Sequence, residues 1–368
     1  MLDLKRQYQS IREEILAAVE RVCESQQFVL GPEVEALERE VAAFTGASAA
    51  VGCASGTDAL WLALAACGVK SGDFVITTPF SFLASASAIA RAGATPVFAD
   101  IQSVTFNIDP DDVAIKAQEA KPQVLLPVHL YGQCADMDAL QPIADEFKMT
   151  IVEDAAQAIG AAWGKEKAGS FGAAATFSFY PTKNLSAYGD AGMVTTMDPE
   201  RADHMRRLRN HGSARRYIHE ELGWNARMDA MQGAILRVKL PHVEEWNHKR
   251  RDRAATYDRL FNEAGLSSTA IVLPYKNPKA HHIFHQYVVR ARRRDELREF
   301  LTARKIGSEI YYPLPLHLQP SFAYLGYGKG SFPEAERAAA EVLALPMFPE
   351  LTEEEQRWVV QNISDFYC

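Results

Sequence analysis

A carboxylic acid and a lysine each follow a short apolar run in the middle of the chain. Residues 150–152 (TIV) lead into Asp154, and residues 173–180 (AAATFSFY) lead into Lys183. Short apolar runs bounded by turn residues are typical of buried strands. Because ligands bind outside the carboxyl ends of the strands of an open parallel sheet, we expect Asp154 and Lys183 to reach one crevice.

An acid and an amine in one crevice suit pyridoxal phosphate. This cofactor is held on a lysine as a Schiff base, with an acidic partner at its pyridine nitrogen. Lys183 would anchor the cofactor and then carry protons, while Asp154 would keep the ring nitrogen protonated. The spacing alone leaves a second interpretation open, in which Lys183 lies on the surface, Asp154 at the edge of the core, and the two never meet.

A second informative site opens the helix expected at residues 59–67. Gly56 and Thr57 precede it, and a helix N-terminus offers backbone N–H groups to a phosphate. The alternative is that Ser55, Thr57 or Asp58 simply caps the helix. The segment is not a Walker P-loop, because no Gly-Lys-Ser/Thr follows it.

Strands and helices alternate around these residues. The pattern predicts an α/β fold with a doubly wound, mainly parallel sheet and helices on both faces. Strands are expected at residues 48–53, 74–78, 95–100, 123–128, 150–154, 173–180 and 192–196. Helices are expected at residues 1–24, 33–44, 59–67, 84–92, 137–147, 199–210, 228–240 and 241–263, with a further one inside 103–122.

The rest of the chain predicts a smaller α+β domain. Strands are expected at residues 285–290 and 307–311, and helices at 295–304, 334–343 and 352–363. We therefore expect a large domain over residues 1–240, including the N-terminal helix, and a small C-terminal domain over residues 241–368. Residues 211–227 have weak periodicity and predict a long loop, which in a compact domain is usually functional.

Composition narrows the classes of function. The 368 residues carry a net charge of −8, with a pI near 5.7, so no basic excess favours nucleic acid or an anionic membrane. No apolar run approaches the length of a membrane span, and the first ten residues do not resemble a signal peptide. The five cysteines show neither metal spacing nor a disulfide framework, so we expect no metal and a cytoplasmic location.

Seven motifs in order resemble the DegT/DnrJ/EryC1/StrS family of sugar aminotransferases, which are pyridoxal-phosphate enzymes of fold type I. The resemblance covers nearly the whole chain, from Leu2 to Pro346, and each motif alone would be a weak signal. The motifs are CASGTDAL (53–60), TPFSFLASA (78–86), LYGQCADMDAL (130–140), EDAAQA (153–158), SFYPTKNLSAYGDAG (178–192), NARMDAMQGAIL (225–236) and YYPLPLHLQP (311–320).

The resemblance implies a role for each matching residue. Lys183 stands at the position of the Schiff-base lysine and Asp154 at that of the pyridinium partner. Other family positions would contact the phenolic oxygen (Gln157), the two ring faces (Ala156 and Phe82), the phosphate (Gly56, Thr57 and Ser178) and the phosphate of the partner subunit (Asn225). The last position implies a homodimer with shared sites. Without the resemblance, Phe82 would be expected in the core and Asn225 in a turn.

The resemblance also implies a reaction, because family members with lysine at position 183 transfer amino groups, whereas those with histidine are dehydratases. We expect transfer from L-glutamate to a nucleotide-linked keto-sugar, 3-keto and dTDP- or UDP-linked, in the biosynthesis of deoxyamino sugars or surface polysaccharide. A 4-keto sugar is the alternative. Candidate substrate contacts are Arg215, Arg216, Tyr217, Arg227 and His317, although Arg215 and Arg216 are equally consistent with a solvated basic patch.

Two other classes of function stay open on the sequence. The first is a pyridoxal-phosphate enzyme that acts on ordinary amino acids, which would not need the segments 130–140 and 311–320. The second is a non-catalytic regulator that binds the cofactor. A regulator of transcription would need a DNA-binding module, and the sequence shows neither a helix-turn-helix outside the catalytic frame nor a basic excess.

Overall fold

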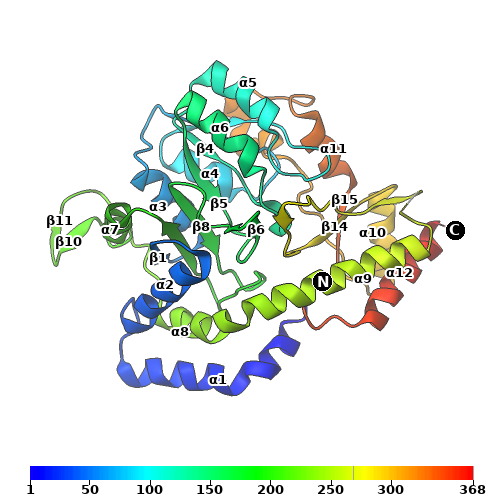
Figure 1. The fold of residues 1–368 in the computed structure, drawn as a ribbon, viewed down its shortest axis with the longest axis horizontal. Coiled ribbons are helices and arrows are strands. Elements are labelled where there is room, and N and C mark those ends of the chain that lie inside the picture. Colours follow the sequence, from blue (N-terminus) through cyan, green and yellow to red (C-terminus); the bar gives the residue numbers. More distant parts are fainter. Residues whose placement is uncertain (268, 368) are drawn as a thin grey trace.

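A seven-stranded sheet forms the centre of the computed structural model, which describes residues 1–267 and 269–367 (Figure 1). Its strand order is β1-β9-β8-β5-β4-β2-β3. Neighbouring strands pair in parallel except at β9, which is antiparallel to both β1 and β8. The strands are β1 (Ala49–Cys53), β2 (Phe74–Thr77), β3 (Thr95–Phe98), β4 (Val124–Leu126), β5 (Thr150–Asp154), β8 (Ala174–Ser178) and β9 (Gly192–Thr196). The predicted mainly parallel sheet is confirmed.

Helices cover both faces of this sheet because successive strand residues point to opposite sides. Val75 belongs to one buried cluster and Ile76 to the other, and Val152 and Ile151 divide in the same way. One cluster contains side chains of α3 (Gly56–Ala66), α4 (Ala84–Arg91) and α7 (Pro199–Leu208). The other contains side chains of α2 (Pro32–Thr45), α5 (Pro110–Ala120), α6 (Met137–Phe147) and α8 (Ala230–Lys239). The sheet is therefore doubly wound, as predicted.

The connection from β5 to β8 brings two predicted site residues to one edge. The two strands are parallel neighbours, and Asp154 at the end of β5 is opposite Thr176 of β8. Between them the chain forms β6 (Ala162–Trp163) and β7 (Glu166–Lys167), which pair with each other, and β6 also pairs with β13 (Ala280–His281). The turn that carries Lys183 follows β8 directly.

The later part of the chain has its own three-stranded sheet, with the order β12-β14-β15. Its strands are β12 (Ile271–Val272), β14 (Tyr287–Ala291) and β15 (Val342–Leu345). Its helices are α9 (Val243–Glu263), α10 (Arg294–Ala303), α11 (Pro333–Glu341) and α12 (Glu353–Tyr367). Apolar residues of this part join the same buried cluster as α3 and α4, and the proposed domain boundary at residue 240 stays a prediction.

Two secondary-structure predictions in this part are wrong. Residues 307–311 form no strand, and only Glu309 makes an isolated bridge, to Ala344. Residues 342–343 do not extend the helix, because the buried run Val342–Leu345 pairs with β14 over its whole length. β15 thus takes the place in the sheet that the sequence pattern assigned to residues 307–311.

Two peripheral segments complete the fold. The N-terminal helix α1 (Leu4–Ser25) packs on α8 through Ile11, Ile15 and Ile235. The predicted loop 211–227 contains a short hairpin of β10 (Ser213–Arg215) and β11 (Ile218–His219), which projects from the body of the molecule (Figure 1). The short 3-10 helices are η1 (Leu130–Gly132), η2 (Leu240–His242), η3 (Leu316–Leu318) and η4 (Pro320–Leu325). Among the described residues, no helix has both the length and the apolar character that crossing a membrane requires.

Candidate active site

Asp154 is a buried carboxylic acid at the carboxyl end of β5. The hydroxyl of Ser85 donates to its Oδ2 at 2.7 Å, and the backbone N–H of Ala156 donates to its Oδ1 at 3.2 Å. Burial raises the pKa of Asp154, while these two hydrogen bonds and the positive charge of Lys183 oppose that shift. The side chain is thus held in one orientation by α4 and by the turn that follows β5.

Lys183 lies in the turn after β8, where its backbone N–H donates to the carbonyl oxygen of Tyr180 at 2.8 Å. Burial lowers the pKa of its amine to about 8, and the charge of Asp154 opposes that shift. Lys183 is partly buried, and it follows β8, the parallel neighbour of the strand that ends in Asp154, so both residues lie at the same edge of the sheet. This position differs from that of a fully exposed surface lysine, and the meeting of the amine with the acid stays a prediction.

The N-terminus of α3 lies directly against the end of β8. A Cβ atom on Gly56 would lie 2.6 Å from the Cβ atom of Ser178, so only glycine permits this approach. Ser55 caps the helix, and its Oγ accepts the N–H of Asp58 at 3.1 Å. Capping is therefore confirmed for Ser55, and it leaves Thr57 beside Gly56 in the first turn. Gly56, Thr57 and Ser178 together place backbone N–H groups and hydroxyls at one corner of the site.

Phe82 and Gln157 differ in their surroundings. Phe82 is 59% exposed, which contradicts a core position, and its ring lies 6.3 Å from the ring of Tyr312. Gln157 is buried: its Oε1 accepts the N–H of Tyr131 at 2.7 Å, and its Nε2 donates to the hydroxyl of Tyr312 at 3.1 Å. Ala156 joins Gln157 to the strand that carries Asp154.

Tyr312 is a site residue that our sequence analysis did not single out. It comes from the segment 311–320, far along the chain, and its hydroxyl meets Gln157 while the charge of Asp154 contributes to raising its pKa. Burial is the larger cause of that raised pKa. The signal in the sequence was the tyrosine pair before the proline-rich stretch, but no spacing rule connects residue 312 to residue 157.

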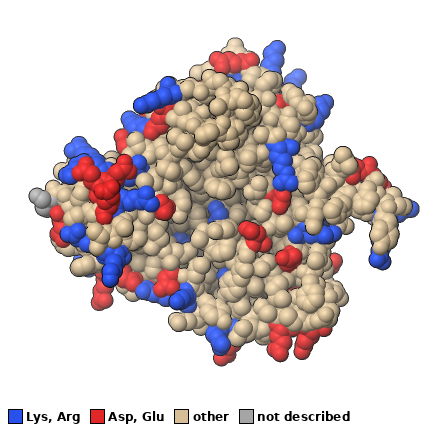
Figure 2. All heavy atoms as spheres, turned by 180° about the vertical axis from the view of Figure 1, so that it is seen from behind, with Lys and Arg blue, Asp and Glu red and all other residues tan. Residues whose placement is uncertain are grey.

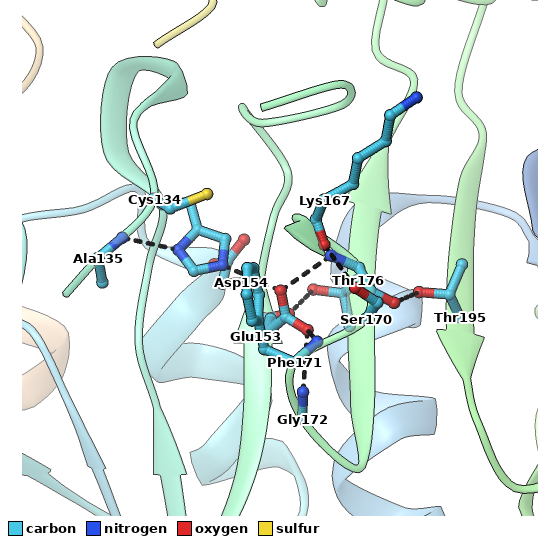
Figure 3. Close-up of polar contacts among 12 residues, drawn as sticks. Cys134, Ala135, Glu153, Asp154, Lys167, Ser170, Phe171, Gly172, Thr176 and Thr195 are labelled. Atoms are coloured by element: carbon cyan, nitrogen blue, oxygen red, sulfur yellow. Dashed lines mark hydrogen bonds and ion pairs between the residues drawn. The ribbon is translucent and has the colours of Figure 1, made fainter. Parts of the chain in front are cut away.

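A buried polar cluster lies beside Asp154, around the preceding residue Glu153 (Figure 3). Its Oε1 accepts the N–H groups of Phe171 and Gly172 at 2.8 and 3.1 Å, and its Oε2 accepts that of Gly169 at 2.9 Å. His129 Nε2 lies 3.0 Å from the same Oε2. Because the N–H of Ala135 donates to His129 Nδ1, the hydrogen of the neutral ring lies on Nε2 and points to Glu153. This cluster fixes two loops against the end of β5.

The predicted substrate contacts, together with Asn225, the predicted contact to the phosphate of the partner subunit, lie in three different environments. Arg215, Arg216 and Tyr217 are exposed on the β10–β11 hairpin, whose basic tip projects from the side of the molecule in Figure 2. Asn225 is exposed and forms an isolated bridge with Asn210, while Arg227 bridges Cys53 and donates to the Asn210 side chain at 3.0 Å. The His317 side chain is fully buried, and its Nε2 lies 3.0 Å from Glu336. Within the described ranges, no hydrogen bond or ion pair joins any of these residues to Lys183 or Asp154.

The cysteines give no sign of reactive or metal-binding sites. Cys53, beside the Gly56 loop, is buried, and burial raises the pKa of its thiol. The four cysteines at positions 23, 53, 67 and 134 are unpaired, and Cys368 lies outside the described residues. Over the described ranges, no group of three or more His, Cys, Asp or Glu side chains is arranged to hold a metal ion.

The family model of the DegT/DnrJ/EryC1/StrS aminotransferase family matches residues 9–364. The chain belongs to this family. A dTDP-3-amino-3,4,6-trideoxy-alpha-D-glucose transaminase of Streptomyces venezuelae is 44% identical over 99% of this chain and 95% of the relative. The crystal structure of S. venezuelae DesV in complex with a ketimine intermediate superposes with a TM-score of 0.95, at 44% identity, covering 99% of this chain and 97% of that one.

Another relative of this member of the DegT/DnrJ/EryC1/StrS family is described by a regulatory role and not by an enzymatic activity. A protein of Geobacillus stearothermophilus described as a pleiotropic regulatory protein is 52% identical over 100% of this chain and 98% of the relative. The family match and the structural likeness confirm the predicted family, the fold type I architecture and the expectation of an aminotransferase.

Proposed function

We propose that this protein is a pyridoxal-phosphate-dependent aminotransferase that moves an amino group from L-glutamate to a nucleotide-linked keto-sugar. The sugar is 3-keto and dTDP- or UDP-linked, and the product enters deoxyamino-sugar or surface-polysaccharide biosynthesis. The proposal rests on one observation: Asp154 ends β5 and Lys183 follows its parallel neighbour β8, at one edge of the sheet, in a chain of the aminotransferase family.

The donor groups around the site fit pyridoxal phosphate. The lowered pKa of Lys183 makes its neutral amine available for covalent attachment of an aldehyde. The buried carboxyl of Asp154 is a suitable partner for a protonated ring nitrogen. Gly56, Thr57 and Ser178 offer the N–H and hydroxyl donors that a phosphate requires.

The sides of the site fit a planar ring. The Phe82 ring is largely exposed although phenylalanine is usually buried, so it is available to stack on one face of the cofactor. Ala156, whose backbone N–H donates to Asp154, would contact the other face with its small side chain. Gln157 would meet the phenolic oxygen of the cofactor, while its own amide stays oriented by Tyr131 and Tyr312.

When bound, the cofactor supplies a reversible carrier for the amino group and withdraws electrons from the substrate carbon. Lys183 would hold the cofactor and, once its amine is free, would carry a proton to and from the substrate carbon. Asp154 would keep a proton on the ring nitrogen. The near-neutral pKa of Lys183 suits both proton removal and proton return.

We also propose a homodimer in which each active site is completed by the partner subunit. Asn225 is exposed next to the strand that supports the Gly56 loop, so it is available to reach the phosphate of a second site. The exposed hairpin residues Arg215, Arg216 and Tyr217, together with Arg227, would contact the nucleotide or the sugar. The burial of His317 against Glu336 makes it the weakest of the five candidates.

We propose a large domain over residues 1–240, a small domain over 241–368, and action in the cytoplasm.

A panel of nucleotide sugars tests this proposal. The purified protein is incubated with L-glutamate and with 3-keto or 4-keto sugars linked to dTDP or UDP, and mass spectrometry detects an aminated product. We expect amination of at least one 3-keto sugar. Amination of 4-keto sugars alone would support the alternative substrate, and turnover of amino acids with simple keto acids alone would support an ordinary aminotransferase.

The regulatory name of the Geobacillus relative motivates the second candidate, a non-catalytic protein that binds the cofactor. Catalysis is favoured because this protein has both a lysine at position 183 and an acid at position 154, at one edge of the sheet, and a protein that only binds the cofactor would not need both. A protein that absorbs visible light through bound cofactor, but transfers no amino group to any sugar or keto acid, would support the regulator instead.

A further inference from the structure

The residue that follows Lys183 is one member of a buried chain of side-chain amides. Asn184 is 5% exposed, and both ends of its amide group have a partner. Its Nδ2 donates to Oδ1 of Asn247 at 2.7 Å, and its Oδ1 lies 3.0 Å from Nδ1 of His285. Asn247 in turn donates from Nδ2 to the carbonyl oxygen of Ile159 at 2.9 Å. The chain thus connects the lysine turn with α9 and with the segment before β14.

The direction of every hydrogen bond in this chain follows from its last member. The carbonyl oxygen of Ile159 can only accept, so Asn247 must present its Nδ2 to it and its Oδ1 to Asn184. Asn184 must then donate from Nδ2 and accept at Oδ1. His285 therefore carries its hydrogen on Nδ1, and its Nε2 is left as an unprotonated acceptor. Reversing either amide would place two donors or two acceptors face to face, which is costly for buried groups.

The surroundings of the chain are built to keep it in place. Gly160 has a φ of +85°, and a Cβ atom there would lie 2.7 Å from Nδ2 of Asn247, so glycine leaves the room that this amide occupies. Arg250 is one turn further along α9 and donates from Nη1 to the carbonyl oxygens of Phe284 and His285, at 3.3 and 3.2 Å. One face of α9 therefore holds both the Asn184 side chain and the backbone of His285.

The environment of His285 favours its neutral form. Burial lowers its pKa well below the usual value, and the positive charges of Lys183 and Arg250 add to this effect. The hydrogen bond to Asn184, the residue after Lys183, places the imidazole beside the lysine turn. A neutral ring beside the amine adds no further positive charge to the site, and its tautomer is set by Asn184.

We propose that Asn247 and His285 are positioning residues for Lys183. The hydrogen bonds from Ile159 through Asn247 and Asn184 to His285 attach the lysine turn to α9, and they hold His285 as the Nδ1–H tautomer. This inference rests on the proposed function, because it assigns a purpose to the position of Lys183. A misplacement of about 1 Å can slow a reaction by about a hundredfold, so the anchor of this turn matters to proton transfer.

Nitrogen NMR of the protein labelled with ¹⁵N-histidine tests the tautomer without measuring activity. The His285 signals are assigned by their loss in His285→Asn, and spectra are recorded with bound cofactor and after its removal. We expect a protonated Nδ1 and an unprotonated Nε2, with no titration between about pH 6 and about pH 9. An Nε2–H tautomer, or titration in that range, would overturn the proposed donor and acceptor assignment of these hydrogen bonds.

The kinetic test compares Asn247→Leu with Asn362→Leu. Asn362 is equally buried and donates to the carbonyl oxygen of Trp358 within α12, so its substitution is a matched control for the loss of a buried amide. We expect the half-reaction with L-glutamate to slow by about tenfold to about a hundredfold at saturation in Asn247→Leu, with bound cofactor retained and a smaller change in KM. A rate within about twofold of the control would refute the positioning role.

A second pair of variants covers the case in which Asn247→Leu does not fold. His285→Leu removes the partner of Asn184, whereas His285→Asn keeps an N–H donor near the place of Nδ1. We expect His285→Asn to recover most of the rate that His285→Leu loses, and equal losses in both would count against the proposal. A wild-type protein without any glutamate-dependent half-reaction would refute the proposed function instead, and the tautomer measurement would still decide the direction of the chain.

Discussion

The edge of β5 and β8 and the β10–β11 hairpin differ in how firmly the surrounding fold fixes their side chains. Asp154 is 4% exposed and has fixed hydrogen-bond partners, whereas Tyr217 on the hairpin is 81% exposed. The first region has a single geometry because packing and buried hydrogen bonds determine it. The second offers charges and an aromatic ring to the solvent. In our proposal, the lysine and the acid that carry out the chemistry therefore belong to the buried fold of one subunit, whereas recognition of the sugar belongs to an exposed surface.

Replacing Lys183 tests the buried region most severely. We expect Lys183→Ala to lower the rate of amino transfer by roughly 10⁴-fold, since both the covalent anchor and the proton carrier are lost. The visible absorption of the lysine-bound cofactor should disappear in the same variant, and circular dichroism should show an intact fold. A variant that keeps either the absorption or the turnover would refute the assignment of Lys183.

Asp154→Asn retains the shape of the side chain but removes its negative charge. We expect the half-reaction with L-glutamate to slow by about a hundredfold, because the ring nitrogen loses the partner that keeps it protonated. Stopped-flow spectroscopy of the half-reaction measures this effect. Ser85→Ala should slow the same half-reaction less, since it removes one hydrogen bond to Asp154 without removing the acid. An unchanged rate in Asp154→Asn would show that the acid has no role in the chemistry.

The lowered pKa of Lys183 predicts a pH dependence. Only the neutral amine can attack an aldehyde, so attachment of the cofactor to the cofactor-free protein should speed up as the pH rises through about 8 and level off above it. At pH 7 the neutral fraction is about one tenth, so attachment should be about tenfold slower than on the plateau. Absorption during stopped-flow mixing gives the rate. A midpoint near the ordinary lysine value of about 10.4 would show that the amine is solvated.

The sequence predicted the strands of the buried region well for a physical reason. Asp154 ends one strand and Lys183 follows another, and the carboxyl ends of parallel strands share an edge, so local patterns were sufficient to place both residues at that edge. Tyr312 was missed because its contact with Gln157 joins segments 155 residues apart, which no local pattern encodes. Residues 307–311 were wrongly assigned as a strand because several short apolar runs compete for one place in a sheet, and pairing with β14 decides which run takes it.

Substitutions in the β10–β11 hairpin should have the smallest effect, and this effect should be restricted to binding of the nucleotide sugar. We expect Arg215→Ala to raise the KM for the nucleotide sugar by roughly fivefold, about 1 kcal/mol for an exposed charge contact. The half-reaction with glutamate should be unchanged, and the free energy of unfolding should shift by no more than about 0.5 kcal/mol, since the side chain is exposed. Arg304→Ala, an exposed arginine after α10, is the control and should leave the KM for the sugar unchanged. A loss in the glutamate half-reaction of Arg215→Ala would place the hairpin in the chemistry of the cofactor, and the division between a buried chemical centre and an exposed recognition surface would then fail.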